Sequence, residues 1–206
     1  MNLRFEEEQK RERRIKIIKE GLRFLIEVII VIFISWLIIT FALKKISMIG
    51  SSMETTLYNG EDVIVNKSSF LILSPRREQV IAFYPESEEG EDTDELDDTV
   101  IQIRRVVGLP GEKIKIKEGQ IYINGKVLKE KYPFEVMHSA GRAVNEIQLA
   151  EDEYFVLSDN RNDMDDSRNT SFTKVRKKNI IGKVILRLNP FSLLGGPEQE
   201  EPKKEE

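Results

Sequence analysis

Two serines lie in a turn that would leave a hydroxyl group open to chemistry. The segment Gly50-Ser51-Ser52-Met53 is a turn rich in Gly and Ser, and an Asn59-Gly60 turn follows it before an alternating apolar stretch. A serine hydroxyl on such a turn can act as a nucleophile when a neighbouring base takes its proton. The competing interpretation of these residues is an ordinary connecting loop.

A second polar cluster, at 158–168, combines aspartates with Arg161 and Arg168. Its carboxylates invite a calcium-site interpretation, but Thr170 stands at the twelfth position from Asp159, where an EF-hand loop needs glutamate. The absence of cysteine excludes disulfides, thiolate zinc sites and a cysteine nucleophile. We therefore expect no metal and no other cofactor.

The only histidine, His138, lies in the weakly patterned stretch 132–149, which holds no nearby nucleophile. We interpret it as an exposed loop residue rather than a catalytic one.

One apolar run is long enough to cross a membrane. Residues 24–43 contain a single charge, Glu27, and about twenty apolar residues span a hydrocarbon core of roughly 30 Å. Eight basic residues precede this run within 1–23, whereas only Lys44 and Lys45 flank its far side. This imbalance predicts a single-pass cell-membrane protein with a cytoplasmic N-terminus and an extracytoplasmic domain.

The sequence predicts four regions in this order: a cytoplasmic basic tail at 1–23, a transmembrane helix at 24–43, a folded domain at 46–194 and a disordered tail at 195–206. With 206 residues in all, one domain of ordinary size is expected behind the anchor. A net charge of -4 argues against nucleic acid as a partner. Membrane lipid is the expected environment of the helix.

The folded region reads as a mainly antiparallel β-sheet. Alternating apolar residues predict strands at 61–67, 80–84, 99–107 and 180–188, and Glu118-Gly119 and Asn124-Gly125 have the composition of hairpin turns. The short apolar run 69–74 is interpreted as a core strand rather than as a surface pressed against lipid. The stretch 85–99 holds nine acidic residues and no basic ones, which predicts a solvated loop.

Three separated segments together resemble the bacterial type I signal peptidases, the membrane-anchored leader peptidases, and specifically the Gram-positive kind. Residues 50–57 resemble the family's G-x-S-M-x-P-T-L, residues 104–111 its K-R-V-x-G-L-P-G, and residues 158–168 its G-D-N-R-x-x-S-x-D-S-R. The order and spacing of the three, behind an N-in anchor, make coincidence improbable.

The resemblance implies a β-rich extracytoplasmic domain that removes N-terminal signal peptides from exported preproteins. It implies that Ser52 is the nucleophile and that a lysine takes its proton, and it places Arg104 at that lysine position. It further implies that the peptide binds as an added strand. The residues that would bind substrate or support the site are Gly50, Ser51, Met53, Asp159, Asn160, Arg161, Asp166 and Arg168.

The departures from the family pattern fall on the proton acceptor. Arg104 carries a guanidinium that stays charged, and Met164 replaces the serine that bonds the family's lysine. Thr55 and Ser158 are milder changes.

Three interpretations remain open. The first is a signal peptidase that uses another base, for which Lys67 and Lys113 are the nearest lysines in sequence. The second is a catalytically impaired relative that binds secreted or pilus subunits, and the third is a membrane-tethered domain with a structural role.

Overall fold

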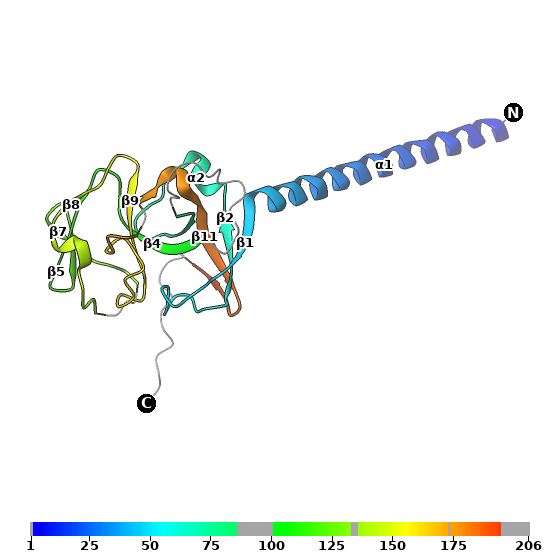
Figure 1. Ribbon diagram of the computed structural model, residues 1–206. Coiled ribbons are helices and arrows are strands. Elements are labelled where there is room, and N and C mark those ends of the chain that lie inside the picture. Colours follow the sequence, from blue (N-terminus) through cyan, green and yellow to red (C-terminus); the bar gives the residue numbers. More distant parts are fainter. Residues whose placement is uncertain (1, 86–100, 133–135, 173, 195–206) are drawn as a thin grey trace. The chain divides into compact units, whose positions relative to one another are not determined.

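The computed structural model describes residues 2–85, 101–132, 136–172 and 174–194 (Figure 1). Most of the acidic stretch 85–99 and the whole of the tail 195–206 lie outside the described residues, so their predicted states stay predictions. The chain divides into two units, Met1–Ala42 and Leu43–Glu206.

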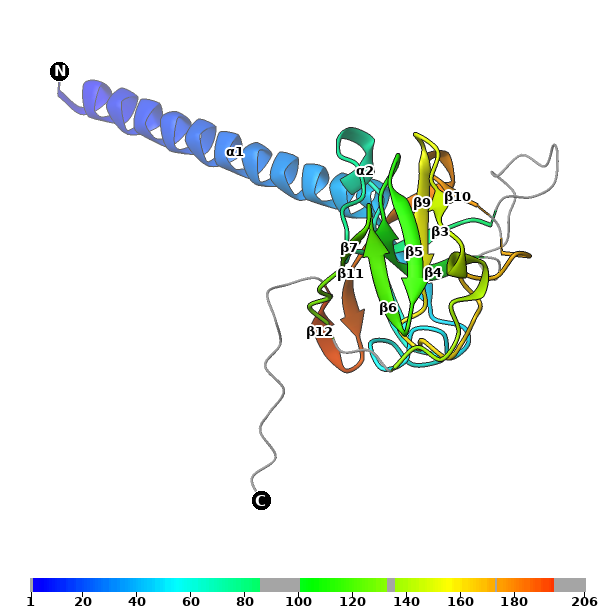
Figure 2. The ribbon, with the colours of Figure 1, turned by 90° about the vertical axis from the view of Figure 1, so that its left-hand side faces the viewer.

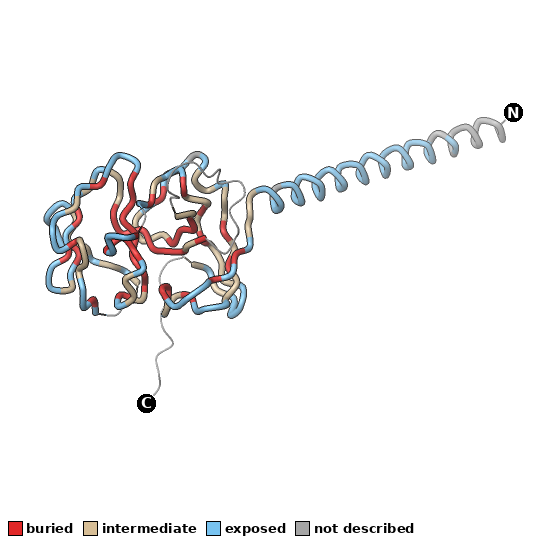
Figure 3. The backbone as a smooth tube through the Cα atoms, viewed as in Figure 1, coloured by how far each residue is buried: buried red, intermediate tan, exposed pale blue. Residues whose placement is uncertain are grey.

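The first unit is one helix, α1 (Asn2–Ala42), and its described side chains are exposed along its length (Figure 3). Its part from Arg13 to Ala42 is long and apolar enough to cross a membrane. Arg23 Nε lies 3.3 Å from Glu27 Oε1, one helical turn away, which is the pairing expected for neighbouring opposite charges. The predicted span 24–43 falls within this helix except for Leu43, which begins the next element.

The second unit contains an eight-stranded sheet and a four-stranded sheet, both antiparallel (Figures 1 and 2). The large sheet has the order β1-β2-β11-β3-β4-β9-β10, and β12 pairs with β11. Its strands are β1 (Leu43–Ser47), β2 (Asp62–Asn66), β3 (Val80–Phe83), β4 (Gln102–Gly108), β9 (Glu153–Leu157), β10 (Val175–Arg176), β11 (Ile180–Leu188) and β12 (Phe191–Leu193).

The small sheet has the order β7-β6-β5-β8. Its strands are β5 (Lys113–Lys117), β6 (Gln120–Ile123), β7 (Lys126–Val127) and β8 (Ile147–Gln148), and two 3-10 turns, η3 (Gly141–Val144) and η4 (Lys177–Asn179), complete the unit with the short helix α2 (Ser69–Ile72). The predicted turns at Glu118-Gly119 and Asn124-Gly125 join these strands. Gly119 and Gly125 both have positive φ, which glycine adopts without a steric cost.

The centre of the large sheet is buried on both faces. In β3, Val80 and Ala82 belong to one apolar cluster, whereas Ile81 and Phe83 belong to another on the opposite face. Successive side chains of a strand point to opposite faces, so a continuous apolar run is what a doubly covered strand requires. The mainly antiparallel β fold behind an N-terminal helix, predicted from the sequence, is confirmed.

The prediction for 69–74 is wrong. These residues form the short helix α2 and its exit, and the side chains of Leu71 and Leu73 are 81% and 56% exposed. A strand placed here would need a neighbour to take its backbone hydrogen bonds, but after Asn66 the chain turns: the Asn66 side chain accepts from Ser68 Oγ (2.9 Å) and from Ser69 N–H (3.2 Å).

Candidate active site

The serine loop, residues 48–61, connects β1 to β2. Two backbone hydrogen bonds close its base: Met48 N–H donates to Glu61 C=O (2.8 Å) and Gly60 N–H donates to Met48 C=O (2.8 Å). Gly50, at φ +86°, donates its N–H to Asn59 Oδ1 (3.0 Å), which ties the two predicted turns together. The motif therefore forms a closed loop at the far end of β1 from the helix.

Two apolar side chains hold the serine loop against the sheet. Met53 and Leu57 are fully buried in the cluster that contains Val63 and Ile103, and Leu57 N–H donates to Met53 C=O (2.8 Å). Burying a side chain of this size is worth about 1.5–3 kcal/mol. This packing fixes the backbone on either side of Ser52.

Ser52 itself is 4% exposed. Among the described residues, neither its hydroxyl nor its backbone N–H donates a hydrogen bond, while its carbonyl accepts one from Asn160 N–H (3.1 Å). The Asn160 side chain reaches Ser51 C=O at 3.4 Å. The structure thus places the predicted nucleophile beside residues 158–168, called the third motif below. Within the described residues, the hydroxyl and the N–H of Ser52 have no hydrogen-bond acceptor.

Arg104 lies in β4 and is 3% exposed. Its Nε donates to Asp165 C=O (2.6 Å), Nη1 donates to Ile103 C=O (2.6 Å) and Nη2 pairs with the Asp165 carboxylate. Its guanidinium carbon lies 5.9 Å from the centre of the Phe172 ring. Burial lowers the pKa of Arg104 from its ordinary value, and the nearby carboxylates of Asp165, Asp166 and Asp163 offset part of that effect.

A pocket of about 360 Å³ lies where the serine loop, β4 and the third motif meet. Ile103 of β4, Ile101 just before that strand and Met48 of the serine loop give it apolar walls. Arg104 and Asp165 add charge. Its full lining is Met48, Ile49, Pro85, Ile101, Gln102, Ile103, Arg104 and Asp165. No lysine contributes to this pocket within the described part of the chain.

The two lysines nearest in sequence lie elsewhere. Lys67 lines a different pocket, beside α2, and Lys113 lies in the small sheet with its Nζ 3.2 Å from Glu146 Oε1. His138 is exposed, as expected. None of the three candidate bases that the sequence offered, Lys67, Lys113 and His138, lines the pocket beside the serine loop.

A buried ion pair between Arg105 and Asp159 connects the segments that form the site. Arg105 Nε donates to Asp159 Oδ1 (2.7 Å), and Thr56 Oγ1 donates to Asp159 Oδ2 (2.6 Å). Asp159 thereby joins the serine loop to β4. Burial lowers the pKa of Arg105, but the Asp159 carboxylate and its hydrogen bond more than offset this, so the net pKa of Arg105 is raised.

Asp166 and Arg168 stabilise the backbone of the third motif through hydrogen bonds. Asp166 accepts from Ser158 N–H (3.0 Å) and from the Arg168 backbone N–H (2.9 Å), and its carboxylate pairs with the Arg168 side chain at 2.7 Å. Arg168 also donates to Arg161 C=O (2.7 Å). Both side chains are fully buried. They hold the turn that presents Asn160 and Asp165 and do not reach the pocket.

Arg161 is placed by residues that the motif analysis did not single out. Its guanidinium pairs with Glu130 at 2.5 Å and lies 3.1 Å from the Tyr132 hydroxyl. Burial lowers the pKa of Arg161, while its hydrogen bond to the Glu130 carboxylate and the other nearby groups raise it more. Nothing in the local pattern of 129–149 marks Glu130 or Tyr132, because their partner is about thirty residues away. Asp165, the partner of Arg104, was likewise visible only as one member of an acidic cluster.

Met164 stands where the resemblance expects a hydroxyl. It is half-buried and its methyl group lies against Gly141, where a Cβ would meet Met164 Cε at 2.9 Å. The thioether packs against this neighbouring turn. At the position where the resemblance implies a serine, the structure therefore shows an apolar contact rather than a strong hydrogen-bond acceptor.

Comparison with known proteins places these motifs in a family. A family model of the signal peptidases, peptidase S26, matches residues 21–189. The chain belongs to this family. The three aligned motifs lie within the matched residues, so the predicted membership is confirmed.

Individual members of the signal peptidase family are similar over most of the chain. A probable signal peptidase I-2 of Synechocystis sp. is 30% identical over 159 residues, which are 76% of this chain and 67% of the relative. A signal peptidase I of Bacillus caldolyticus is 35% identical over 153 residues (69% and 77%). A signal peptidase I from Enterococcus faecalis V583, known from its crystal structure, is 28% identical, covering 54% of this chain and 97% of that one with a TM-score of 0.39.

Proposed function

We propose that this chain is a membrane-anchored signal peptidase I, of the Gram-positive kind, that binds the signal peptides of exported preproteins but cleaves them feebly. The family membership and the relatives' names support the substrate class, and α1 supports the anchor. The feeble turnover is argued from Arg104, at the position where the family has its lysine.

The observation that carries the proposal is the bonding of Arg104. All three of its guanidinium nitrogens donate to Asp165 or Ile103, so these contacts hold the side chain in the pocket wall. A guanidinium paired with a carboxylate keeps its proton at neutral pH. Arg104, at the lysine position of the resemblance, can therefore attract an anion but cannot accept the proton of Ser52.

The binding half of the proposal rests on β4. Residues 102–105 pair with β3, but pairing with β9 begins only at Arg105, so the first half of β4 has one strand neighbour within the described residues. An extended peptide can add to such an edge through main-chain hydrogen bonds. The apolar walls of Ile101 and Ile103 beside it would receive small side chains near the cut.

The proposal is tested by introducing a side chain that can accept the proton of Ser52. Arg104→Lys together with Met164→Ser supplies an amine and the acceptor that would hold it in line. General-base catalysis contributes about 10²- to 10⁴-fold, so kcat/KM of the double variant on a signal-peptide substrate should exceed wild type by a factor in that range. The assay uses full-length protein in detergent and a peptide with a small residue before the cut.

Ser52→Ala, made in the double variant, is the matched blank and should abolish the gained cleavage, because the nucleophile is lost. Wild-type cleavage at the rate of the double variant would contradict the impaired-base argument. A wild type that binds the peptide with no turnover at all would favour the alternative, a binding or assembly factor for secreted subunits.

A further inference from the structure

The first half of β4 has few backbone groups to offer at its open edge. Val106 bonds the backbone of 78–79, which leads into β3, through its N–H (2.9 Å) and its C=O (2.8 Å). The backbone groups of successive strand residues point to alternate sides, so Arg105 and Ile103 direct theirs away from β3. Arg105 is paired with Leu157 of β9. Ile103 is therefore the residue of β4 whose N–H and C=O face the open edge.

The side chain of Arg104 already occupies that carbonyl. Its Nη1 donates to Ile103 C=O (2.6 Å), while its Nε donates to Asp165 C=O (2.6 Å) and its Nη2 pairs with the Asp165 carboxylate. The guanidinium thus connects the open edge of β4 to the third motif. Both residues of this pair line the pocket of about 360 Å³, as do Ile101 and Ile103. The connection therefore lies in the wall of the pocket beside the proposed peptide edge.

A peptide that adds to β4 as a strand needs the backbone groups of Ile103. One of its N–H groups would donate to Ile103 C=O, which is the acceptor that Arg104 Nη1 uses. A charged donor makes a stronger hydrogen bond than a neutral amide, so the peptide competes with a stronger donor. Asp165 favours the competitor, because its carboxylate holds the same guanidinium through Nη2.

The two members of the pair differ in exposure. The side chain of Arg104 is 3% exposed and that of Asp165 is 57% exposed. The carboxylate can therefore be altered without opening a cavity in the core. This makes Asp165 the member at which the contact can be weakened while the sheet stays intact.

We propose that the Arg104–Asp165 pair is an autoinhibitory contact that closes the open edge of β4 to peptides. In the free protein Arg104 caps the Ile103 carbonyl, and a peptide gains this acceptor when the guanidinium gives it up. The inference rests on the proposed binding of signal peptides along β4. It gives the feeble turnover a second cause, weak peptide binding, which acts before any proton is transferred.

The experiment measures peptide binding without turnover. Full-length protein carrying Ser52→Ala, the parent, is titrated in an uncharged detergent into a fluorescein-labelled signal peptide. The peptide has a small residue before the cut and no charged residue near it, and fluorescence anisotropy gives Kd. Asp165→Asn removes the charge that faces Arg104 and keeps the shape of the side chain. Kd should fall by about 3- to 10-fold, which is the range expected for one net hydrogen bond.

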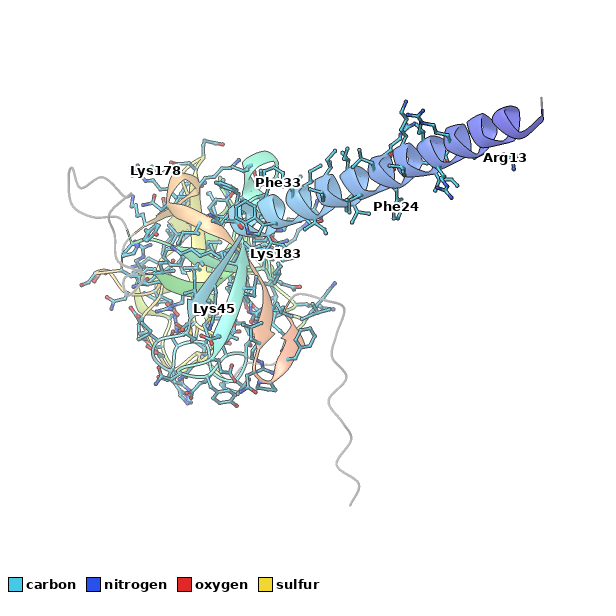
Figure 4. The ribbon with its side chains drawn as sticks, turned by 90° about the vertical axis from the view of Figure 1, so that its right-hand side faces the viewer. Arg13, Phe24, Phe33, Lys45, Lys178 and Lys183 are labelled. Carbon is cyan, nitrogen blue, oxygen red and sulfur yellow. The ribbon has the colours of Figure 1, made fainter. Side chains whose placement is uncertain are left out.

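Two controls carry the same chemical change at carboxylates outside the pair. Asp163→Asn lies in the same turn and keeps the Oδ1 that accepts from Asp165 N–H (3.0 Å). Asp62→Asn breaks an ion pair of the large sheet, in which Asp62 lies 2.7 Å from Lys45 (labelled in Figure 4), and neither residue lines the pocket. Both variants should keep the Kd of the parent. An equal gain from either would assign the effect to net charge and overturn the proposal.

A double-mutant cycle tests the contact itself. Arg104→Met replaces the guanidinium with an unbranched apolar side chain and should lower Kd at least as far as Asp165→Asn does. Asp165→Asn added to Arg104→Met should then change Kd no further, because its partner is already gone. A full additional gain would show that the two residues act separately, which overturns the pair. Circular dichroism checks that each variant keeps its sheet.

The acceptor is tested from the side of the peptide. Methylation of the backbone nitrogens near the cut, one at a time, removes the N–H that would donate to Ile103 C=O. One of these peptides should lose the gain that Asp165→Asn gives, and a gain that survives in all of them would overturn competition for this carbonyl. Equal Kd values for the parent and every variant would overturn the autoinhibitory contact and leave peptide binding standing, whereas no binding by any of them would overturn both.

Discussion

At the scale of single residues, the chemistry of this chain turns on what surrounds Arg104. The side chain is buried, yet each of its three nitrogens has a hydrogen-bond partner, so the Asp165 carboxylate and two carbonyl groups offset part of the cost of burying its charge. The same bonds hold the guanidinium against Asp165. In the proposed function, this charged side chain occupies the position at which the family's lysine would accept a proton.

This argument predicts a change in pH dependence. A lysine base is inactive while protonated, so kcat/KM of the Arg104→Lys, Met164→Ser variant should rise with pH and level off above the pKa of Lys at position 104. Wild-type Arg104 stays charged across about pH 6 to 9, so wild type should lack this rising limb. Initial rates across that range measure it. A rising limb of the same position in wild type would point to a different base.

Buried ion pairs give a second prediction at this scale. Glu130→Gln removes the charge that faces Arg161, whose side chain is fully buried, and breaking a buried pair costs about 3–5 kcal/mol. The matched control is Glu146→Gln, which breaks a pair with Lys113 that is about half exposed and should cost less than about 1 kcal/mol. Thermal unfolding in detergent, followed by circular dichroism, compares the two. Equal losses would show that the Glu130 pair is not a structural support.

At the scale of elements, β11 is the strand through which the large sheet is assembled. It lies between β2 and β3 and also pairs with β12, with a register shift on the β3 side between Ile180 and Gly182. A Cβ at Gly182 would lie 2.3 Å from the carbonyl oxygen of Asn66 in β2. The backbones of β11 and β2 therefore approach too closely here for a side chain. The glycine is a packing requirement here, not a turn residue.

Gly182→Ala should therefore destabilise the protein by about 3 kcal/mol or more, since backbone rather than a flexible side chain must move. Gly60→Ala is the control: it has φ +82° and no atom within 4 Å of its Cβ position, so only backbone strain of about 1–2 kcal/mol is expected. Urea unfolding of both variants gives the comparison. A smaller loss at 182 than at 60 would contradict the close-approach argument.

At the scale of the whole molecule, the chain consists of an apolar helix and a β unit that carries the site. The excess of Lys and Arg before the apolar run predicts that residues 46–206 lie outside the cytoplasm. Protease added to intact protoplasts should degrade the β unit and spare a tag placed before residue 2. Protection of the β unit together with loss of the tag would reverse the predicted orientation.

Local patterns were sufficient for much of this protein. A membrane-length apolar run, period-two alternation and Asn-Gly turns depend on neighbours in sequence. Each predicted an element that the structure contains, such as α1, β2 and the turn at Asn124-Gly125. The serine motif also read correctly as a loop, because Gly50 and the Asn59-Gly60 turn set its backbone locally. The family could be recognised because its motifs are short contiguous segments.

The remainder depended on contacts between distant segments. The motif resemblance placed Arg104 at the lysine position, but it did not identify the observed partner, Asp165, which is 61 residues away and which no local pattern encodes. Residues 69–74 read as a core strand because apolar runs usually find a sheet neighbour, whereas here Asn66 turns the chain and Leu71 is left exposed. Burial and pairing are properties of the assembled sheet, so only the tertiary structure decided which charges are held together and which apolar side chains remain outside.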